Sequence, residues 1–152
     1  MSGHWTRAAL AGIAGTIVIT AVGLWLAPLM GVPRMNPAEM LAGAMGGLLL
    51  LGWVAHFMIG TILALIYATI APRLPGPPAV RGALYGLAPW LVAQIAVMPA
   101  MGMTLFSGSA LMATGSLIGH IAYGATVGAI YGLPEPASRA AARQASQPRQ
   151  AT

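Results

Sequence analysis

Four uninterrupted apolar runs decide what this chain can fold into. They cover about residues 8–30, 45–70, 82–105 and 110–133, and none of them contains Asp, Glu, Lys or Arg. A helix needs about 20 apolar residues to cross a bilayer, and continuous runs favour helices over the alternating strands of a membrane barrel. The sequence therefore predicts an all-α membrane protein with four transmembrane helices.

The composition supports a lipid environment and excludes several kinds of chemistry. Charged residues make up 6% of the chain, against about 25% in soluble domains. The chain has no Cys and two acidic side chains, so thiolate metal sites and paired-carboxylate hydrolysis are excluded. Its seven arginines are scattered and form no patch for nucleic acid. We therefore expect the lipid bilayer as the main partner, and we predict no catalytic residue.

The placement of arginine predicts the orientation in the membrane. One side carries six arginines, namely Arg7, Arg73, Arg81, Arg139, Arg143 and Arg149. The other side carries Arg34 alone. Because positively charged loops stay in the cytoplasm, we expect a multi-pass inner-membrane protein with both termini cytoplasmic. The aromatic residues Trp5, Tyr67, Tyr85 and Tyr131 are then expected to lie at the cytoplasmic interface and anchor the helices there.

Two boundaries can be placed along the chain. We expect a transmembrane domain over residues 1–133, followed by a basic, disordered cytoplasmic tail over 134–152. In the loop before the second apolar run, Asn36 followed by Pro37 is typical of a helix start. A straight helix from there to Ile70 would exceed the hydrocarbon thickness, so we predict a bend at Gly46–Gly47.

The chain repeats its own motifs in the same order. R-x-A-L-x-G occurs at 7–12 and 81–86, P-x-M-G at 28–31 and 99–102, and H-x-x-x-G at 56–60 and 120–124. We therefore divide the chain into a first half (residues 7–73) and a second half (residues 81–133), with two helices each. Repeats of two spans enter the membrane from the same side, so a pseudo-two-fold axis along the membrane normal should relate the halves.

This layout, with R-x-A-L-x-G and the paired H-x-x-x-G, resembles an uncharacterised bacterial family of small four-helix inner-membrane proteins. The resemblance covers about residues 7–133. It implies the fold, and it implies no activity because the function of that family is unknown.

One polar side chain lies near the middle of each predicted helix: Thr20, His56, Gln94 and His120. Such side chains are costly in a bilayer and normally face the bundle interior. Small residues at a spacing of four accompany both histidines, in the stripes Gly52, His56, Gly60, Ala64, Ala68 and Ser116, His120, Gly124, Gly128, Gly132. We therefore expect the two histidines to face each other across the bundle axis, as a shared ligand or a hydrogen-bonding pair.

Three functions remain open at this point. In the first, the protein is a non-catalytic structural or assembly subunit of a larger membrane complex, or a homo-oligomer. Each histidine then only bonds to a neighbouring helix through Gln94 or Thr20. The G-x-x-x-G pairs at 82–86 and 124–128 would then join it to another subunit.

In the second, His56 and His120 are the axial ligands of a haem b used in electron transfer. Gly60 and Gly124, one turn away, would leave room for the porphyrin faces. Thr20 and Gln94 would accept the second ring N–H of each histidine, as partners of ligating imidazoles usually do.

In the third, the protein binds or transports Cu(I). Thioether sulfur is a soft ligand suited to this ion, and imidazole can follow it. Met30, Met98 and Met101 would form an outer path that leads to His56 and His120.

Overall fold

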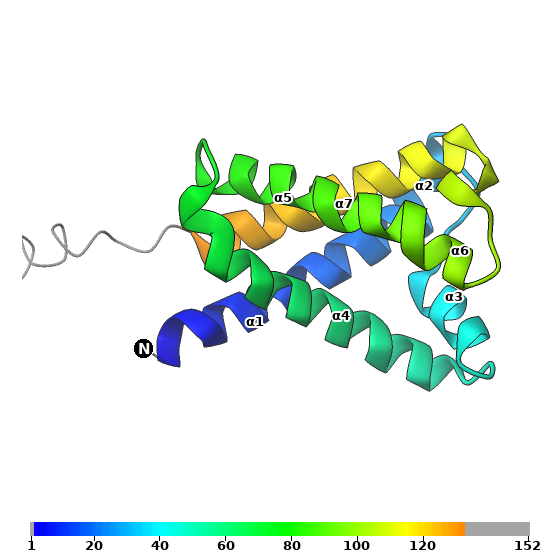
Figure 1. The fold of residues 1–152 in the computed structure, drawn as a ribbon, viewed down its shortest axis with the longest axis horizontal. Coiled ribbons are helices and arrows are strands. Elements are labelled where there is room, and N and C mark those ends of the chain that lie inside the picture. The colour runs from blue at the N-terminus through cyan, green and yellow to red at the C-terminus, as the bar shows by residue number, and fades with distance from the viewer. Residues whose placement is uncertain (1, 133–152) are drawn as a thin grey trace, which may run out of the picture.

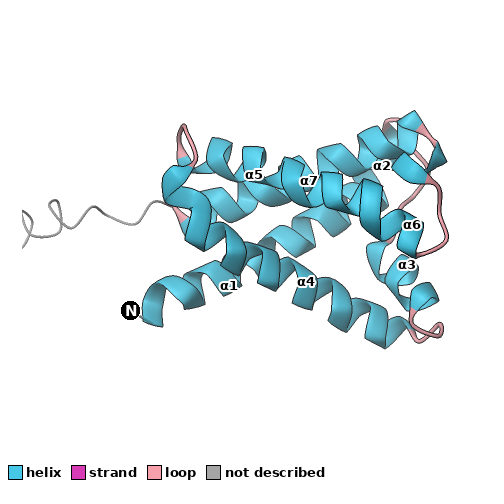
Figure 2. Ribbon diagram, in the orientation of Figure 1, coloured by secondary structure: helices cyan, strands magenta, loops and turns pink. Residues whose placement is uncertain are grey.

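The computed structural model describes residues 2–132, and within that range it contains helices and loops but no strand (Figure 2). The predicted tail, residues 134–152, lies outside the described residues. The first half contains two long helical segments with a short helix between them. Its elements are α1 (Ser2–Ala21), the π-helical η1 (Val22–Leu26), α2 (Ala27–Leu29), α3 (Pro37–Ala44), α4 (Leu49–Ile70) and the 3-10 helix η2 (Ala71–Arg73).

The second half also contains two long helical segments, without a counterpart of α3. Its elements are α5 (Pro78–Val92), the π-helical η3 (Ala93–Val97), α6 (Met98–Ala100), the 3-10 turn η4 (Leu105–Gly108) and α7 (Ala110–Tyr131). The N-terminus and the α4–α5 connection lie at one end of the molecule, at the left in Figure 1. We call this the arginine end, because it carries Arg7, Arg73 and Arg81.

Four helical segments are long and apolar enough to cross a membrane. They are His4–Leu29, Leu49–Arg73, Pro78–Ala100 and Ala110–Tyr131. Large apolar side chains point outward from them; Trp25 is 67% exposed and Ile62 is 47% exposed. The structure is therefore compatible with a membrane protein, and the number and length of the predicted helices are confirmed.

The predicted helix start and bend are both present. The Asn36 side-chain oxygen accepts hydrogen bonds from the backbone N–H of Ala38 (3.0 Å) and Glu39 (3.4 Å) and so caps α3. Gly46 and Gly47 have φ angles of 87° and 88°, a conformation that favours glycine and that separates α3 from α4. α3 folds back against the start of α4, where Gly52 faces Ala38 and Ala42.

A π-helical turn precedes a proline in both halves. Proline lacks an N–H, and its ring crowds the carbonyl four residues earlier in an α-helix. In η1 and η3 the bonds shift by one residue, so the Ala27 N–H reaches the Val22 carbonyl and the Met98 N–H reaches the Ala93 carbonyl. Each helix then ends in the same way, at Gly31 and Gly102, both with φ of 78°. The repeated P-x-M-G motif therefore has the same backbone conformation in the two halves.

Small residues bring α1 against α4 and α5 against α7. A Cβ atom added to Gly12 would lie 2.8 Å from the Thr61 Cα and 2.9 Å from the Ala64 Cβ. In the second half, a Cβ on Gly82 would overlap the Gly124 carbonyl oxygen, and one on Gly124 would overlap the Gly82 carbonyl oxygen. Glycine thus permits backbone contact between the two helices of each half.

The two halves meet mainly between α1 and α7, so the helices follow the spatial order α4, α1, α7, α5. Gly15 receives the Tyr123 ring and the Val127 side chain. The corresponding contact between α4 and α5 is slight. One position of R-x-A-L-x-G explains the difference, because the first half has the small, buried Ala11 where the second half has Tyr85. The larger ring holds α5 away from α4.

Tyrosines fill the space between the halves near the arginine end. The Tyr67 ring centroid lies 5.3 Å from that of Tyr85 and 5.8 Å from that of Tyr131. All three residues are buried, and the Tyr85 hydroxyl donates to the Leu63 carbonyl over 2.8 Å. The prediction that these three tyrosines anchor the membrane interface is therefore wrong, whereas Trp5 is 43% exposed. Their rings pack inside the protein, and backbone carbonyls satisfy their hydroxyl groups.

The arginines of R-x-A-L-x-G cap helices of the opposite half. Arg7 on α1 donates from Nε to the Ile130 carbonyl of α7 (3.1 Å). Arg81 on α5 donates from Nη1 to the Ala71 carbonyl beyond α4 (3.0 Å) and from Nε to the Gly76 carbonyl (2.6 Å). The last carbonyls of a helix have no partner within it and carry partial negative charge, so a cation is favourable there.

Candidate functional site

The four central polar residues belong to two separate hydrogen-bonded groups. The first group joins α1 to α4 and contains Thr16, Thr20 and His56, which are all buried. The Thr20 hydroxyl lies 2.9 Å from His56 Nε2 and 2.7 Å from the Thr16 carbonyl oxygen. His56 therefore faces α1, the first helix of its own half.

The bonds of Thr20 fix the tautomer of His56. A carbonyl can only accept a hydrogen bond, so the single hydroxyl proton of Thr20 goes to the Thr16 carbonyl. His56 Nε2 must then carry a proton and donate it to Thr20. In the neutral ring, Nδ1 is left as an acceptor, and it makes no hydrogen bond within residues 2–132.

The second group joins η3, η4 and α7 at Gln94, which is 1% exposed. Gln94 Nε2 donates to the Ser116 hydroxyl (3.3 Å), and Gln94 Oε1 accepts from the Ser107 hydroxyl (3.2 Å). Gln94 lies in the π-helical turn η3. It therefore connects the loop before α7 to the middle of the helix pair.

His120 completes the second group through its own helix. Its Nδ1 lies 2.8 Å from the Ser116 carbonyl oxygen, so this nitrogen carries the proton. In the neutral ring Nε2 is then an acceptor, and no hydrogen bond to it is formed by the described part of the chain. The two histidines thus have opposite tautomers, and each presents one ring nitrogen with a free lone pair.

These contacts change three sequence-based expectations. The imidazoles do not bond to each other, because each is held within its own group. The middle of each small-residue stripe packs on the first helix of its own half instead of facing a central axis: Gly60 meets α1, and Gly124 and Gly128 meet α5. The expected hydrogen bond between Thr20 and His56 is present. Gln94 does not bond to His120 directly, because Ser116 lies between them. Sequence reasoning missed Ser116 as a partner, although its position four residues before His120 on the same stripe could have indicated it.

The space expected for a porphyrin is filled by protein. Gly60 packs against the Thr16 side chain, and Gly124 packs against the Gly82 backbone. These two glycines were expected to leave the faces of the haem free. Because neighbouring helices cover both glycines, the residues present do not fit a haem between His56 and His120.

The methionines of the predicted copper path lie near the end of the molecule opposite the arginine end. Met98 is buried, whereas Met30 is 44% exposed. Met101 follows Met98 by one turn, and its N–H bonds to the Met98 carbonyl (3.1 Å). Within residues 2–132, no group of three His, Asp or Glu side chains could hold a metal ion. A metal site in this region would therefore depend on imidazole and thioether ligands.

The glycines proposed for subunit association are used inside the chain. Gly82 and Gly86 of α5 pack on α7, and Gly124 and Gly128 of α7 pack on α5. These G-x-x-x-G motifs are therefore not available to a partner, and that sequence argument for an assembly role is wrong. An interface with another protein would have to use the apolar side chains that point outward.

Comparison with known proteins identifies a family and no activity. No curated protein and no solved structure matches the chain. Residues 3–142, which include all four long helices, match a family described as being of unknown function. The chain belongs to this family, DUF6789.

Proposed function

We propose that the protein is an integral inner-membrane protein with both termini in the cytoplasm. Four helices of sufficient length and apolarity support the insertion. The arginine end supports the orientation, since Arg7, Arg73 and Arg81 gather there and Arg34 lies at the other end. A tag at each terminus, probed with an impermeant reagent in spheroplasts, tests this proposal. A terminus that is labelled from outside overturns the orientation.

We further propose a non-catalytic role as a structural or assembly component of the membrane. One observation carries this proposal: the central polar side chains form hydrogen bonds within the fold. Within the described residues, every fully enclosed side-chain nitrogen or oxygen has a hydrogen-bond partner. The free ring nitrogens, His56 Nδ1 and His120 Nε2, are therefore not fully enclosed. The outward surface is apolar, with Val54, Met58 and Ile62 exposed along one side of α4. A partner would therefore meet this protein through side-chain packing in the bilayer.

Cu(I) binding is the second candidate, and the histidine tautomers favour it. A metal-ligating imidazole usually donates its other ring N–H to a fixed acceptor, which orients the ring. His56 and His120 both have this arrangement, with Thr20 and the Ser116 carbonyl as acceptors. The free His56 Nδ1 and His120 Nε2 would be the nitrogen ligands, and Met98 would supply a soft sulfur.

A pair of substitutions separates these two candidates. In His56→Gln the amide nitrogen replaces Nε2, and in His120→Asn it replaces Nδ1, so both donors are kept. The free aromatic nitrogens are lost in both variants. If the role is structural, the double variant keeps its thermal stability in detergent and its cellular function. If the protein handles Cu(I), the wild type binds the ion stoichiometrically under reducing conditions and the double variant does not.

The outward face of α4 can be tested directly. A photoreactive amino acid at Val54, Met58 or Ile62 reports what touches that side in native membranes. The structural proposal expects one discrete protein adduct that recurs in independent preparations and is lost when the neighbouring residue is changed to a charged one. Adducts with lipid alone at all three positions overturn it.

A further inference from the structure

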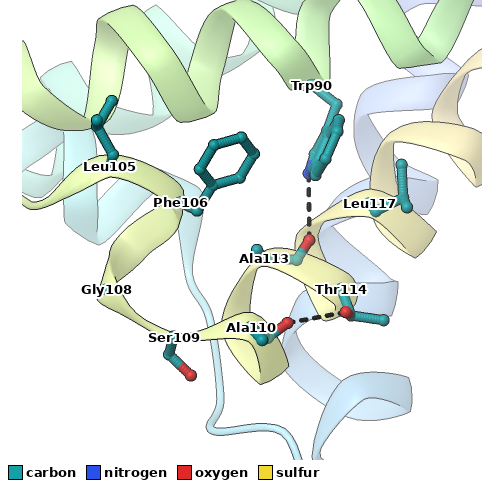
Figure 3. Close-up of a pocket in the computed structure, with 9 residues that line it drawn as sticks. All are labelled: Trp90, Leu105, Phe106, Gly108, Ser109, Ala110, Ala113, Thr114 and Leu117. Atoms are coloured by element: carbon teal, nitrogen blue, oxygen red, sulfur yellow. Dashed lines mark hydrogen bonds between the residues drawn. The ribbon is translucent and has the colours of Figure 1, made fainter.

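An apolar pocket lies at the end opposite the arginine end, where α5, η4 and the start of α7 meet (Figure 3). Its volume is about 430 Å³, which is within the usual range of about 300–1,000 Å³ for small-molecule sites. The walls are mostly aromatic and aliphatic. They are formed by Trp90, Leu105, Phe106, Ala113 and Leu117, with Ala110 and Thr114 at the first turns of α7.

The polar atoms of the pocket wall are already bonded within the protein. Trp90 Nε1 donates to the Ala113 carbonyl (3.1 Å), and the Thr114 hydroxyl donates to the Ala110 carbonyl (2.8 Å). The Ser109 hydroxyl oxygen accepts from the Met112 N–H and caps α7. A polar ligand would give up its bonds to water and gain few in return. The pocket therefore favours an apolar occupant.

A strained turn holds one wall in place. Phe106 and Ser107 have φ angles of 52° and 58°, the left-handed region that costs a residue with a side chain about 1–2 kcal/mol. The Ser107 hydroxyl bonds to Gln94, and the Phe106 ring lies 5.9 Å from the Trp90 ring. Strained residues of this kind persist where the surrounding contacts fix them, and they are often found at ligand clamps.

We propose that this pocket binds the acyl chain of a membrane lipid. The proposal rests on the proposed membrane insertion, because α5 and α7 then place the pocket among lipid chains. Leu105 and Phe106 at its rim are exposed, so a chain can enter from the side. A lipid chain in the bilayer is already in an apolar medium, so moving it into the pocket removes little surface from water. The binding free energy therefore comes mainly from packing against the aromatic walls. Binding is therefore selective by shape and exchanges with bulk lipid.

Tryptophan quenching by lipids with brominated acyl chains tests the proposal in vesicles. One variant keeps Trp90 alone (Trp5→Phe, Trp25→Phe, Trp53→Phe), and a matched variant keeps Trp25 alone (Trp5→Phe, Trp53→Phe, Trp90→Phe). Trp25 is exposed on the outer side of η1 and reports ordinary contact with lipid. We expect Trp90 to be quenched at least twofold more than Trp25 at low fractions of brominated lipid, and to reach saturation earlier.

A filling substitution provides the control. Ala110→Leu occupies the rim of the pocket, while Ala129→Leu adds the same side chain to an exposed position at the other end of α7. Ala110→Leu should remove the excess quenching of Trp90, and Ala129→Leu should not. As a measurement independent of the tryptophan variants, native mass spectrometry should detect one retained lipid on the wild type and its loss in Ala110→Leu.

The outcomes separate this proposal from the proposed membrane insertion. If Trp25 is quenched and Trp90 is quenched no more strongly, the pocket does not bind an acyl chain and the proposal is overturned. The proposal also fails if Ala110→Leu leaves both the quenching and the retained lipid unchanged. If neither tryptophan is quenched, the insertion itself has failed.

Discussion

Replacing Gly82 with Ala should separate α5 from α7 and destabilise the protein. A Cβ at this position would overlap the Gly124 carbonyl oxygen and lie 2.8 Å from the Gly128 backbone nitrogen. Both are backbone atoms of α7, so no flexible side chain can move aside. The helices must shift apart along the whole contact, which includes the close approach of Gly86 to the His120 carbonyl.

The size of the effect follows from two opposing contributions. Forcing an extra methyl group into a packed contact typically costs about 1–3 kcal/mol. Alanine is a better helix former than glycine by about 0.8–1 kcal/mol. The difference is a net loss of between about 0 and 2 kcal/mol in the free energy of unfolding. We expect the upper part of that range, because the added methyl group meets backbone atoms that cannot move aside. Gly124→Ala meets the same contact from the other side, so the two substitutions together should cost less than the sum of their separate effects.

Reversible unfolding in mixed detergent micelles, followed by circular dichroism and by Trp fluorescence, measures this difference. Gly43→Ala is the matched control. It places the same methyl group in a helix, α3, where no atom lies within 4 Å. It should leave stability unchanged or raise it by up to about 1 kcal/mol. If Gly82→Ala behaves like Gly43→Ala, glycine contact does not hold α5 and α7 together.

Three further substitutions test other contacts. Thr20→Val removes the acceptor of the His56 Nε2 proton and should lower the free energy of unfolding in micelles by about 0.5–2 kcal/mol. Thr20→Ser keeps the hydroxyl and should be nearly neutral. Equal stability of the wild type, Thr20→Val and Thr20→Ser contradicts the assigned bond. Asn36→Ala removes the cap of α3 and should lower the free energy of unfolding by about 1 kcal/mol. Hydrogen exchange at the Ala38 and Glu39 amides should become faster, and unchanged exchange there argues against the cap. Arg7→Met should lower the free energy of unfolding by about 0.3–1 kcal/mol and loosen the last turn of α7. Amide hydrogen exchange at Tyr131 that stays as slow as in the wild type contradicts the contact between Arg7 and the Ile130 carbonyl.

The elements of the fold could be predicted from the sequence because their signals are local. Uncharged runs give the four long helices, Asn36 with Pro37 gives the start of α3, and Gly46–Gly47 gives the break before α4. The small residues at a spacing of four also predicted close backbone contact between helices, although they did not identify which helices would pair. Each of these features depends on residues that are near one another in the chain.

The arrangement of the helices could not be predicted in the same way. The repeated motifs suggested equivalent contacts between the halves, yet Tyr85 in place of Ala11 keeps α4 and α5 apart while α1 and α7 touch. The tyrosine positions matched an interface pattern, but the direction of each ring is set by the gap that it fills. The bonding of the central site depended on Ser116, whose role appears only once η3 brings Gln94 onto α7.

The exchange of arginines between the halves has a consequence for synthesis of the chain. Arg7 is synthesised 123 residues before Ile130, whose carbonyl it caps. Until α7 has left the ribosome, α1 has neither that contact nor the Tyr123 ring that covers Gly15. If the chain inserts as proposed, one side of the nascent first hairpin is exposed to lipid until α7 is made. Release of a chain truncated before α7 would leave that side open to other membrane proteins.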